Sequence, residues 1–222
     1  MVKLLENTFR SVNIALVNEL AQMCELLEID VWEVINAAAI NPFRFLPFYP
    51  GPGVGGHCIP IDPQYLAWKM KSHKYFSRFI ELAGDINANM PRYVVNQIMD
   101  FMNDKGKVLS KSRVLILGLA YKKDISDVRE SPALELLELL EKKSMAVDFY
   151  DPFVDGIRWH DGIKKSIKLQ PDTLKNFDLI VLATDHTELD YDLFVNSGIP
   201  IFDTRNKLKS GENVKRLGTG GF

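Results

Sequence analysis

The apolar pattern of the chain changes near residue 106, and this change constrains the fold more than any other feature. Before residue 106, apolar side chains recur about every 3.6 residues, the spacing of amphipathic helices. After it, short and wholly apolar runs such as 114–117 stand between charged residues, which is typical of buried parallel strands. We therefore expect an α/β chain with a helical domain at 1–106 and a doubly wound, Rossmann-like parallel-sheet domain at 107–222.

The local signals divide both halves into elements. Asp30 is the predicted N-cap of one helix, and Asp62, followed by Pro63, is the predicted N-cap of the next. Pro91 removes a backbone donor from a long helix and is expected to kink or restart it. The predicted helices are 3–27, 31–39, 64–71, 77–103 and 131–143, and the predicted strands are 114–118, 146–150, 178–183 and 200–202.

The composition is that of an ordinary globular protein, with 46% hydrophobic and 25% charged residues in 222. A net charge of −2 gives no reason to expect nucleic acid or a membrane surface as a partner, and no apolar run is long enough to span a bilayer. Glu6 and Asn7 lie too early for a signal peptide. The 2 cysteines form no disulfide framework, so we expect a cytoplasmic protein.

Residues 41–63 cannot form regular structure, because prolines and glycines recur throughout them. Gly51, Gly53 and Gly56 match the dinucleotide fingerprint G-x-G-x-x-G, but that fingerprint needs a strand before it and a helix after it. Proline-rich sequence flanks these glycines instead, so we reject the match. Positive φ angles and a close approach of the backbone to a ligand explain the glycines better, and a purely structural turn is the alternative.

Cys58 ends this glycine run and precedes the predicted helix start at Asp62. A thiol on a tight turn beside a helix N-terminus can be exposed and have a lowered pKa, which a nucleophile requires. The alternative is a buried loop cysteine without a chemical role. Cys24 differs, because it lies inside a regular amphipathic helix where core packing is the favoured role.

Basic side chains follow the predicted strands of the second half. Lys122 and Arg129 lie between the first strand and the next helix, and Arg205 follows the last strand. The carboxyl ends of parallel strands form the ligand-binding edge of such a sheet, so these groups favour a diphosphate over chance surface charge. Lys3 and Asn7 share one helix face, which alone is a commonplace solvated pair. The histidines show no metal-ligand spacing, so no metal is predicted.

Several blocks carry a resemblance to a known family, among them Gly55-Gly56-His57-Cys58 and Gly118-Leu119-Ala120-Tyr121-Lys122. The complete set is 3–7, 18–20, 55–62, 118–124, 127–132, 150–152 and 203–206. In order and spacing these blocks resemble the UDP-glucose/GDP-mannose dehydrogenase family over essentially the whole chain, and the combination is highly specific.

The resemblance implies an oxidation of a sugar C6 alcohol to a carboxylate in two steps with two NAD. By resemblance, Cys58 adds to the aldehyde as a thiohemiacetal, whose hydride then leaves to give a thioester. Lys3 and Asn7 match a helix pair that stabilises oxygen charge and positions water, and Asp62 matches a carboxylate that assists thioester hydrolysis. A thiolate, a cationic partner and a carboxylate are also what covalent acyl chemistry requires.

The resemblance also implies binding residues. Tyr121, Lys122 and Arg205 match positions that hold the nucleotide and the sugar of a UDP-sugar. Arg129 matches a position that reaches the NAD pyrophosphate, and Arg44 corresponds to an arginine contributed across a dimer.

Segment 48–58 resembles the branch that acts on UDP-GlcNAc and UDP-ManNAc more than the UDP-glucose branch, with Phe48, Tyr49 and Gly55 as substrate-binding residues. In this family an N-terminal Rossmann domain carries the main NAD contacts, and this sequence has no counterpart of it. We therefore expect part of a homodimeric UDP-sugar dehydrogenase that is inactive alone. The alternatives are a UDP-sugar-binding and dimerisation module without activity, and a helical scaffold with a vestigial site.

Overall fold

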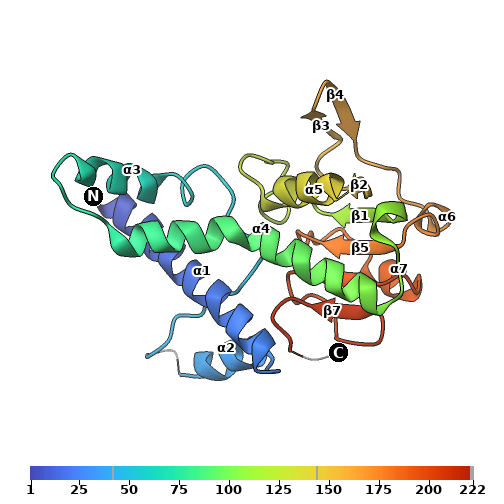
Figure 1. Ribbon diagram of the computed structural model, residues 1–222, viewed down its shortest axis with the longest axis horizontal. Coiled ribbons are helices and arrows are strands. Elements are labelled where there is room, and N and C mark those ends of the chain that lie inside the picture. Colours follow the sequence, from blue (N-terminus) through green and yellow to red (C-terminus); the bar gives the residue numbers. More distant parts are fainter. Residues whose placement is uncertain (42, 144, 221–222) are drawn as a thin grey trace.

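The structure, a computed structural model, describes residues 1–41, 43–143 and 145–220. Figure 1 shows a helical part and an α/β part side by side along the long axis. The helical part contains α1 (Val2–Leu26), α2 (Val31–Ala39), α3 (Asp62–Lys71) and the first half of α4 (Arg78–Asp104). The second half of α4 lies in the core of the α/β part, so this helix belongs to both.

The predicted helices of the first half are confirmed within one or two residues at each end. Asp30 caps α2 as predicted, because its carboxylate accepts the backbone N–H of Trp32 at 2.8 Å. The cap prediction for Asp62 is wrong, since α3 begins at Asp62 itself and Ile61 takes the cap position. The Asp62 carboxylate instead accepts a hydrogen bond from Asn7 of α1, which draws it away from its own helix.

The long helix α4 continues without interruption through Pro91, so of the two expected outcomes, a kink or a restart, the restart is wrong. Pro91 lies buried midway along the helix, and Figure 1 shows the helix axis turning near its middle. A proline removes one backbone hydrogen bond and crowds the preceding turn, which bends a helix that tertiary packing keeps intact. The bend directs the first half of α4 along α1 and the second half along the sheet.

The α/β part is built on five parallel strands in the order β2-β1-β5-β6-β7. This arrangement confirms the predicted doubly wound sheet, in which the strand order reverses between β1 and β5. Apart from β7, which the sequence did not predict, each strand lies within a predicted strand range or one residue beyond it. The strands are β1 (Arg113–Leu117), β2 (Ala146–Tyr150), β5 (Leu179–Leu182), β6 (Ile201–Asp203) and β7 (Val214–Arg216).

Both faces of the sheet are covered, which explains why β5 and residues 114–117 of β1, at its centre, are wholly apolar. Ile116 and Val181 belong to a core shared with α4 and with α5 (Pro132–Lys142). Leu117 and Leu182, which alternate with them, belong to a second core beneath α6 (Pro171–Leu174) and α7 (Tyr191–Asn196). The predicted start of α5 is confirmed, because the Ser131 hydroxyl caps it.

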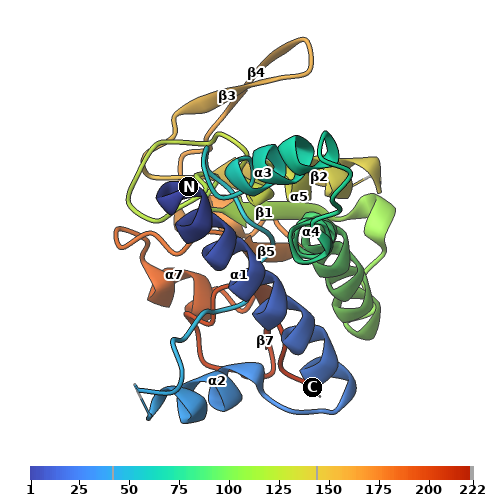
Figure 2. The same cartoon turned by 90° about the vertical axis from the view of Figure 1, so that its left-hand side faces the viewer.

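A hairpin of β3 (Gly156–Trp159) and β4 (Gly162–Lys165) projects from the α/β part, as Figures 1 and 2 both show. The hairpin is tied to α5 through Glu141, whose carboxylate accepts hydrogen bonds from the Trp159 indole at 2.9 Å and from Lys164 at 2.8 Å. The sequence did not predict this hairpin, because its short strands are largely exposed and lack apolar alternation.

The chain segment after β7 returns to the helical part. The backbone N–H of Val31 donates to Gly218 (3.0 Å), and the Trp32 indole donates to the Leu217 carbonyl (2.8 Å). Arg216 of β7 forms an ion pair of 2.6 Å with the capping residue Asp30. The two parts therefore meet through α4 and again through this tail, while the domain division at residue 106 stays a prediction.

Gly118→Ala is expected to lower the free energy of unfolding by roughly 2–4 kcal/mol. Gly118 follows β1 with a φ of +79°, and a Cβ there would lie 2.4 Å from the carbonyl oxygen of Thr184, just after β5. Urea unfolding followed by circular dichroism measures the loss. Gly162→Ala in the hairpin is the control, since a Cβ there meets nothing within 4 Å. An equal loss in both variants would contradict the steric argument.

Candidate functional site

Cys58 lies on the last turn of the loop before α3. Its carbonyl oxygen accepts the backbone N–H groups of Asp62 (2.8 Å) and Ile61 (3.3 Å), which fixes the thiol residue to the start of the helix. Cys58 is partly exposed, whereas Cys24 is buried in the core of α1 and α2. Burial, assisted by the nearby Asp30 carboxylate, raises the pKa of Cys24. Cys24 therefore has the predicted packing role, and Cys58 is the accessible thiol.

Three further predicted site residues meet beside α3. The Asn7 amide donates a hydrogen bond of 2.7 Å to Asp62, and the Lys3 ammonium lies 3.8 Å from the same carboxylate oxygen. Asn7 is buried, while the Lys3 side chain is 71% exposed, so the lysine remains free to face a ligand. Lys3 and Asn7 do share one face of α1, and that face meets the first turn of α3.

The glycines before Cys58 allow the loop to lie directly against the α/β part, because they have no side chain. The N–H of Gly56 donates to the Arg129 carbonyl at 3.1 Å. A Cβ on Gly55 would lie 2.7 Å from the Cβ of Tyr121, and one on Gly56 would lie 2.8 Å from the Tyr121 ring. Gly56 also has a φ of +88°, as the positive-φ interpretation expects. The close approach is thus to the protein's own segment 121–130, which brings Tyr121 beside residues 51–58, the glycine-rich segment that ends at Cys58 and is called the thiol loop.

A buried amide network holds the same loop at Gly51. The Asn18 side chain accepts the N–H of Gly51 at 3.0 Å and donates to Asn87 at 2.9 Å. Asn87 in turn donates to the Ser11 carbonyl at 3.0 Å. Buried amides with their donors used in this way fix a backbone at low cost. The loop is therefore held between α1, α4 and the sheet edge.

Arg129 lies on the same segment as Tyr121 and is already paired. Its guanidinium donates to Asp127 through Nε at 3.0 Å and through Nη2 at 2.7 Å. These bonds lower the pKa of Asp127 to about 2, and the same carboxylate raises the pKa of Arg129, with small contributions from Tyr121 and Cys58. A cation thus stands near the thiol loop, with its carboxylate partner beside it.

Arg205 and Lys122 lie at the carboxyl edge of the sheet, as predicted. The Arg205 guanidinium donates from Nε to the Ala183 carbonyl at 2.7 Å, and its backbone N–H donates to Asp203 at 2.7 Å. Burial lowers the pKa of Arg205, which the nearby carboxylates of Asp185 and Asp203 oppose. Lys122 is exposed on the loop after β1.

A cavity of about 440 Å³ opens beside Arg205 and joins the two parts of the molecule. Tyr49 reaches it from the loop, stacked on Trp32 at a ring distance of 5.8 Å and donating to Asn36 at 3.1 Å. The sequence did not point to Asn36, although Trp32 and Asn36 share one face of α2. The lining residues are Trp32, Asn36, Tyr49, Pro50, Asp185, Arg205 and Asn206.

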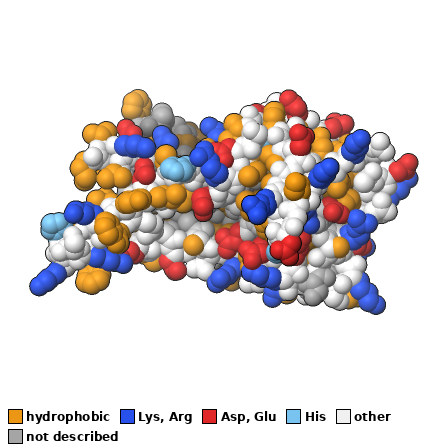
Figure 3. Space-filling view, turned by 90° about the horizontal axis from the view of Figure 1, so that it is seen from above, with side chains coloured by type: hydrophobic (Ala, Val, Ile, Leu, Met, Phe, Trp, Pro, Cys, Tyr) orange, Lys and Arg blue, Asp and Glu red, His pale blue; other side chains and the backbone are white. Residues whose placement is uncertain are grey.

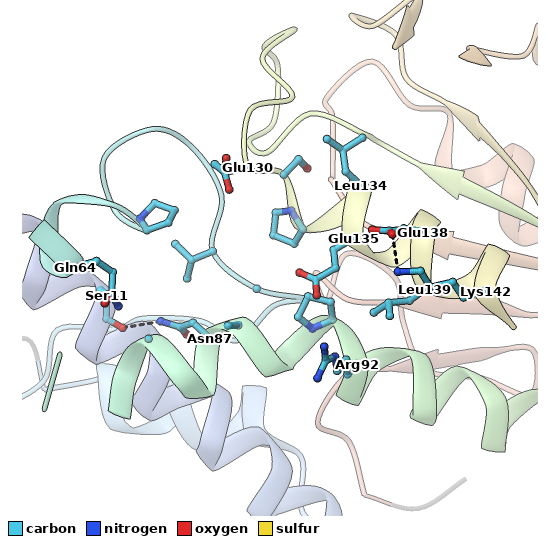
Figure 4. Close-up of a pocket in the computed structure, with 18 of the residues that line it drawn as sticks. Ser11, Gln64, Asn87, Arg92, Glu130, Leu134, Glu135, Glu138, Leu139 and Lys142 are labelled. Carbon is cyan, nitrogen blue, oxygen red and sulfur yellow. Dashed lines mark hydrogen bonds and ion pairs between the residues drawn. The ribbon is translucent and has the colours of Figure 1, made fainter. Parts of the chain in front are cut away.

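A second hollow, of about 720 Å³, lies between α4, α5 and the loop and is drawn in Figure 4. It includes Gly53 and Val54 but neither Cys58 nor Asp62. Figure 4 shows Glu135, Glu138 and Lys142 of α5 along one side and Ser11, Gln64 and Asn87 toward the other. Its acidic and basic groups are mixed, so its volume alone does not make it the reacting site.

Two predicted site residues lie apart from these clusters. The Phe48 ring stands edge-on to Phe9 at 5.7 Å and packs against the core of α1 and α2. Arg44 is exposed between α2 and α3. In the described ranges, no group of three or more His, Cys, Asp or Glu side chains could hold a metal ion. No helix in that same part of the chain is long and apolar enough to cross a bilayer.

Curated relatives match the chain along its length. A UDP-N-acetyl-D-mannosamine dehydrogenase of Methanococcus vannielii is 36% identical over 238 aligned positions, which cover 100% of this chain and 52% of the relative. A UDP-N-acetyl-D-glucosamine 6-dehydrogenase of Salmonella typhi is 39% identical, over 84% of this chain and 43% of the relative. The chain thus spans about half the length of the curated relatives it matches.

A solved structure of a UDP-D-ManNAc dehydrogenase from Pyrococcus horikoshii is similar to the chain, with a TM-score of 0.85 and 34% identity over 99% of this chain and 51% of that one. Residues 1–89 match the central domain of the UDP-glucose/GDP-mannose dehydrogenase family, and residues 115–210 match its UDP binding domain. The first match contains the thiol loop with Lys3, Asn7 and Asp62, and the second contains the sheet edge with Lys122 and Arg205. The chain therefore belongs to the UDP-glucose/GDP-mannose dehydrogenase family.

Proposed function

We propose that this chain supplies the thiol and the nucleotide-sugar site of a cytoplasmic UDP-sugar 6-dehydrogenase that converts the C6 alcohol of UDP-ManNAc or UDP-GlcNAc to a carboxylate with two NAD. The observation that carries the proposal is the cluster of Lys3, Asn7 and Asp62 beside the Cys58 loop, docked against Tyr121. The names of the relatives support the two sugars. Two unpaired cysteines fit a reducing compartment.

Covalent chemistry at Cys58 follows from this cluster. The thiolate attacks the C6 aldehyde carbon, so that a C–S bond forms and the carbonyl electron pair moves onto oxygen. The Lys3 ammonium and the Asn7 amide donate hydrogen bonds to that oxygen and stabilise its charge.

Release of the product uses the neighbouring carboxylate. Once the sugar is held as a thioester, Asp62 accepts a proton from water while the water oxygen attacks the acyl carbon. The C–S bond then breaks, and Cys58 leaves as the thiolate. Asp62 suits this role because its side chain is 20% exposed and keeps one oxygen atom free of the bonds from Asn7 and Lys3.

NAD, when bound, would accept the hydrides of both oxidations, and Arg129 is assigned to its pyrophosphate. In the structure, however, the Arg129 guanidinium is engaged by Asp127. A dinucleotide site also needs a glycine-rich turn that leads from a strand directly into a helix, whereas β1 leads into the loop 118–131. The described residues alone therefore do not make a dinucleotide site.

The nucleotide sugar is proposed to lie along the carboxyl edge of the sheet. Arg205 and Lys122 supply positive charge for the diphosphate. Arg205 lies against the loop at Gly51, and Tyr121, the neighbour of Lys122 in the chain, lies against it at Gly55 and Gly56. Tyr49 lines the cavity beside Arg205, and Gly55 allows the loop to pass close to Tyr121. Phe48 supports this loop from the core side.

A second copy of the chain is the proposed partner. Large apolar side chains are exposed on the helical part, including Trp68 at 69% and Phe79 at 79%. Figure 3 shows apolar side chains gathered over the end of the molecule that holds α1 and α3. Monomers rarely expose contiguous apolar patches of this kind. Arg44, exposed beside α2, is the proposed contribution across such a dimer.

The second candidate is a UDP-sugar-binding and dimerisation module without turnover. The pairing of Arg129 with Asp127 favours it, because it occupies the cation assigned to the cofactor. Both candidates require binding of a UDP-sugar, and they differ only in whether Cys58 reacts.

Lys122→Ala and Arg205→Lys are each expected to weaken UDP binding by roughly tenfold or more, since a hydrogen bond to a charged group contributes about 1.5–3 kcal/mol. Isothermal titration of UDP into the chain measures the affinity, and thermal unfolding checks the fold of each variant. Lys111→Ala, which removes an exposed lysine just before β1 and therefore at the opposite, amino edge of the sheet, is expected to bind as the wild type does. Absence of heat with the wild-type chain would overturn the binding proposal.

NADH formation separates the two candidates. The chain is mixed with the half of the Pyrococcus horikoshii relative that it does not match, together with NAD and UDP-ManNAc or UDP-GlcNAc. The enzyme proposal expects NADH that Cys58→Ser abolishes and Cys24→Ser leaves unchanged, because only Cys58 lies at the site. NADH formation from neither sugar, with UDP binding intact, supports the binding module.

Iodoacetamide is expected to label Cys58 at least about tenfold faster than Cys24 under native conditions, since Cys24 reacts only when the helical core opens. The raised pKa of Cys24 slows its reaction further, because the thiolate is the reacting form. Peptide mass spectrometry after timed quenching measures both rates, and in urea they should converge. Equal rates in the native protein would show that the Cys58 thiol is not accessible.

A further inference from the structure

We infer that His186 is a positioning residue: as a neutral imidazole with its proton on Nε2, it fixes the loop 119–124 that presents Tyr121 and Lys122 at the sheet edge. The effect of His186 on UDP rests on the nucleotide-sugar binding proposed above. His186 belonged to no predicted site, and the sequence offered it only as a histidine without a metal-ligand pattern.

The His186 side chain is completely buried just after β5, beside the point where the strand order reverses. Each ring nitrogen meets one partner. Nδ1 lies 2.9 Å from the backbone nitrogen of Asp124, and Nε2 lies 3.0 Å from a carboxylate oxygen of Asp151. Asp151 follows β2, so the ring bridges the ends of two strands and the loop that leaves the third.

These partners assign the tautomer. The backbone N–H of Asp124 can only donate, so Nδ1 must offer a lone pair. The proton therefore sits on Nε2 and is donated to Asp151. The same carboxylate oxygen accepts the N–H groups of Leu119 at 2.6 Å and Ala120 at 3.0 Å. Burial alone would raise the pKa of Asp151, but the bonds from His186 and from the backbone outweigh it and lower that pKa.

The network holds the loop at both ends. Asp151 binds its first two N–H groups, and His186 binds the N–H of Asp124 at its far end. The Asp124 carboxylate also accepts the N–H and the hydroxyl of Thr187, each at 2.7 Å. Between these fixed points, Tyr121 and Lys122 have little freedom to shift. Because Tyr121 also touches Gly55 and Gly56, the network reaches the thiol loop as well.

Two substitutions test the roles of the two ring nitrogen atoms of His186 one at a time. His186→Asn keeps an acceptor, Oδ1, where Nδ1 faces Asp124, but it cannot reach Asp151. His186→Gln keeps a donor where Nε2 faces Asp151, but it leaves the N–H of Asp124 without a partner. Phe194→Leu, in the buried core under α7, lowers stability without touching the loop and is the control.

The measurements are amide hydrogen exchange at Asp124, the affinity for UDP, the melting temperature and the ¹⁵N shifts of the imidazole. We expect an unprotonated Nδ1 and a protonated Nε2 in the wild type. We also expect exchange at Asp124 and the dissociation constant for UDP to rise roughly tenfold or more in His186→Gln, since one unmade buried hydrogen bond is that strong. His186→Asn should show smaller changes at Asp124, and Phe194→Leu should lower only the melting temperature.

A proton on Nδ1, or wild-type exchange at Asp124 in His186→Gln, overturns the inference. So does a loss of UDP affinity that follows the melting temperature in all three variants. If the wild type binds no UDP, the proposed function fails on its own, while exchange and ¹⁵N shifts still decide whether His186 fixes the loop.

Discussion

The close contact between the glycines of the thiol loop and the segment 121–130 is the constraint on which the candidate site depends. Without side chains on Gly55 and Gly56, the loop backbone can lie against Tyr121 and donate to the Arg129 carbonyl. This contact sets the distance between Cys58, which the helical part supplies, and the basic groups of the sheet edge. A side chain at either glycine would push the loop away from Tyr121 and would move the Cys58 thiol away from the proposed nucleotide site.

Two buried polar networks fix the two segments that meet at this contact, one network on each segment. Asn18 and Asn87 hold the loop at Gly51, and His186 with Asp151 holds the strand-end loop that carries Tyr121. Buried polar groups are costly unless every donor and acceptor is used, and for that reason such networks favour one arrangement over near alternatives. The apolar cores fix the elements, while these hydrogen bonds fix the loops that the chemistry would need.

Local signals predicted the elements well, because helix periodicity, the Asp30 cap and the Ser131 cap act within a few residues of each other. These local signals failed where contacts between residues far apart in the sequence determine the structure. Asp62 leaves its cap position for Asn7, a residue 55 positions earlier, and no local pattern contains that competition. β7 was missed because a strand of three residues with one buried side chain carries no periodic signal. The cavity beside Arg205 was hidden for the same reason, since Asn36 and Asp185 meet there only in three dimensions.

Both parts of the molecule contribute residues to one candidate ligand site, the cavity beside Arg205. α4 packs along α1 in the helical part and into the core beneath α5 in the α/β part. Arg216 binds Asp30 of the helical part as well as Asn206 beside the cavity. A ligand in this cavity would contact Tyr49 and Trp32 from one part and Arg205 from the other, an arrangement common where binding sites form at internal interfaces. Its binding energy would oppose separation of the two parts and would therefore also favour the contact that holds Cys58 in place.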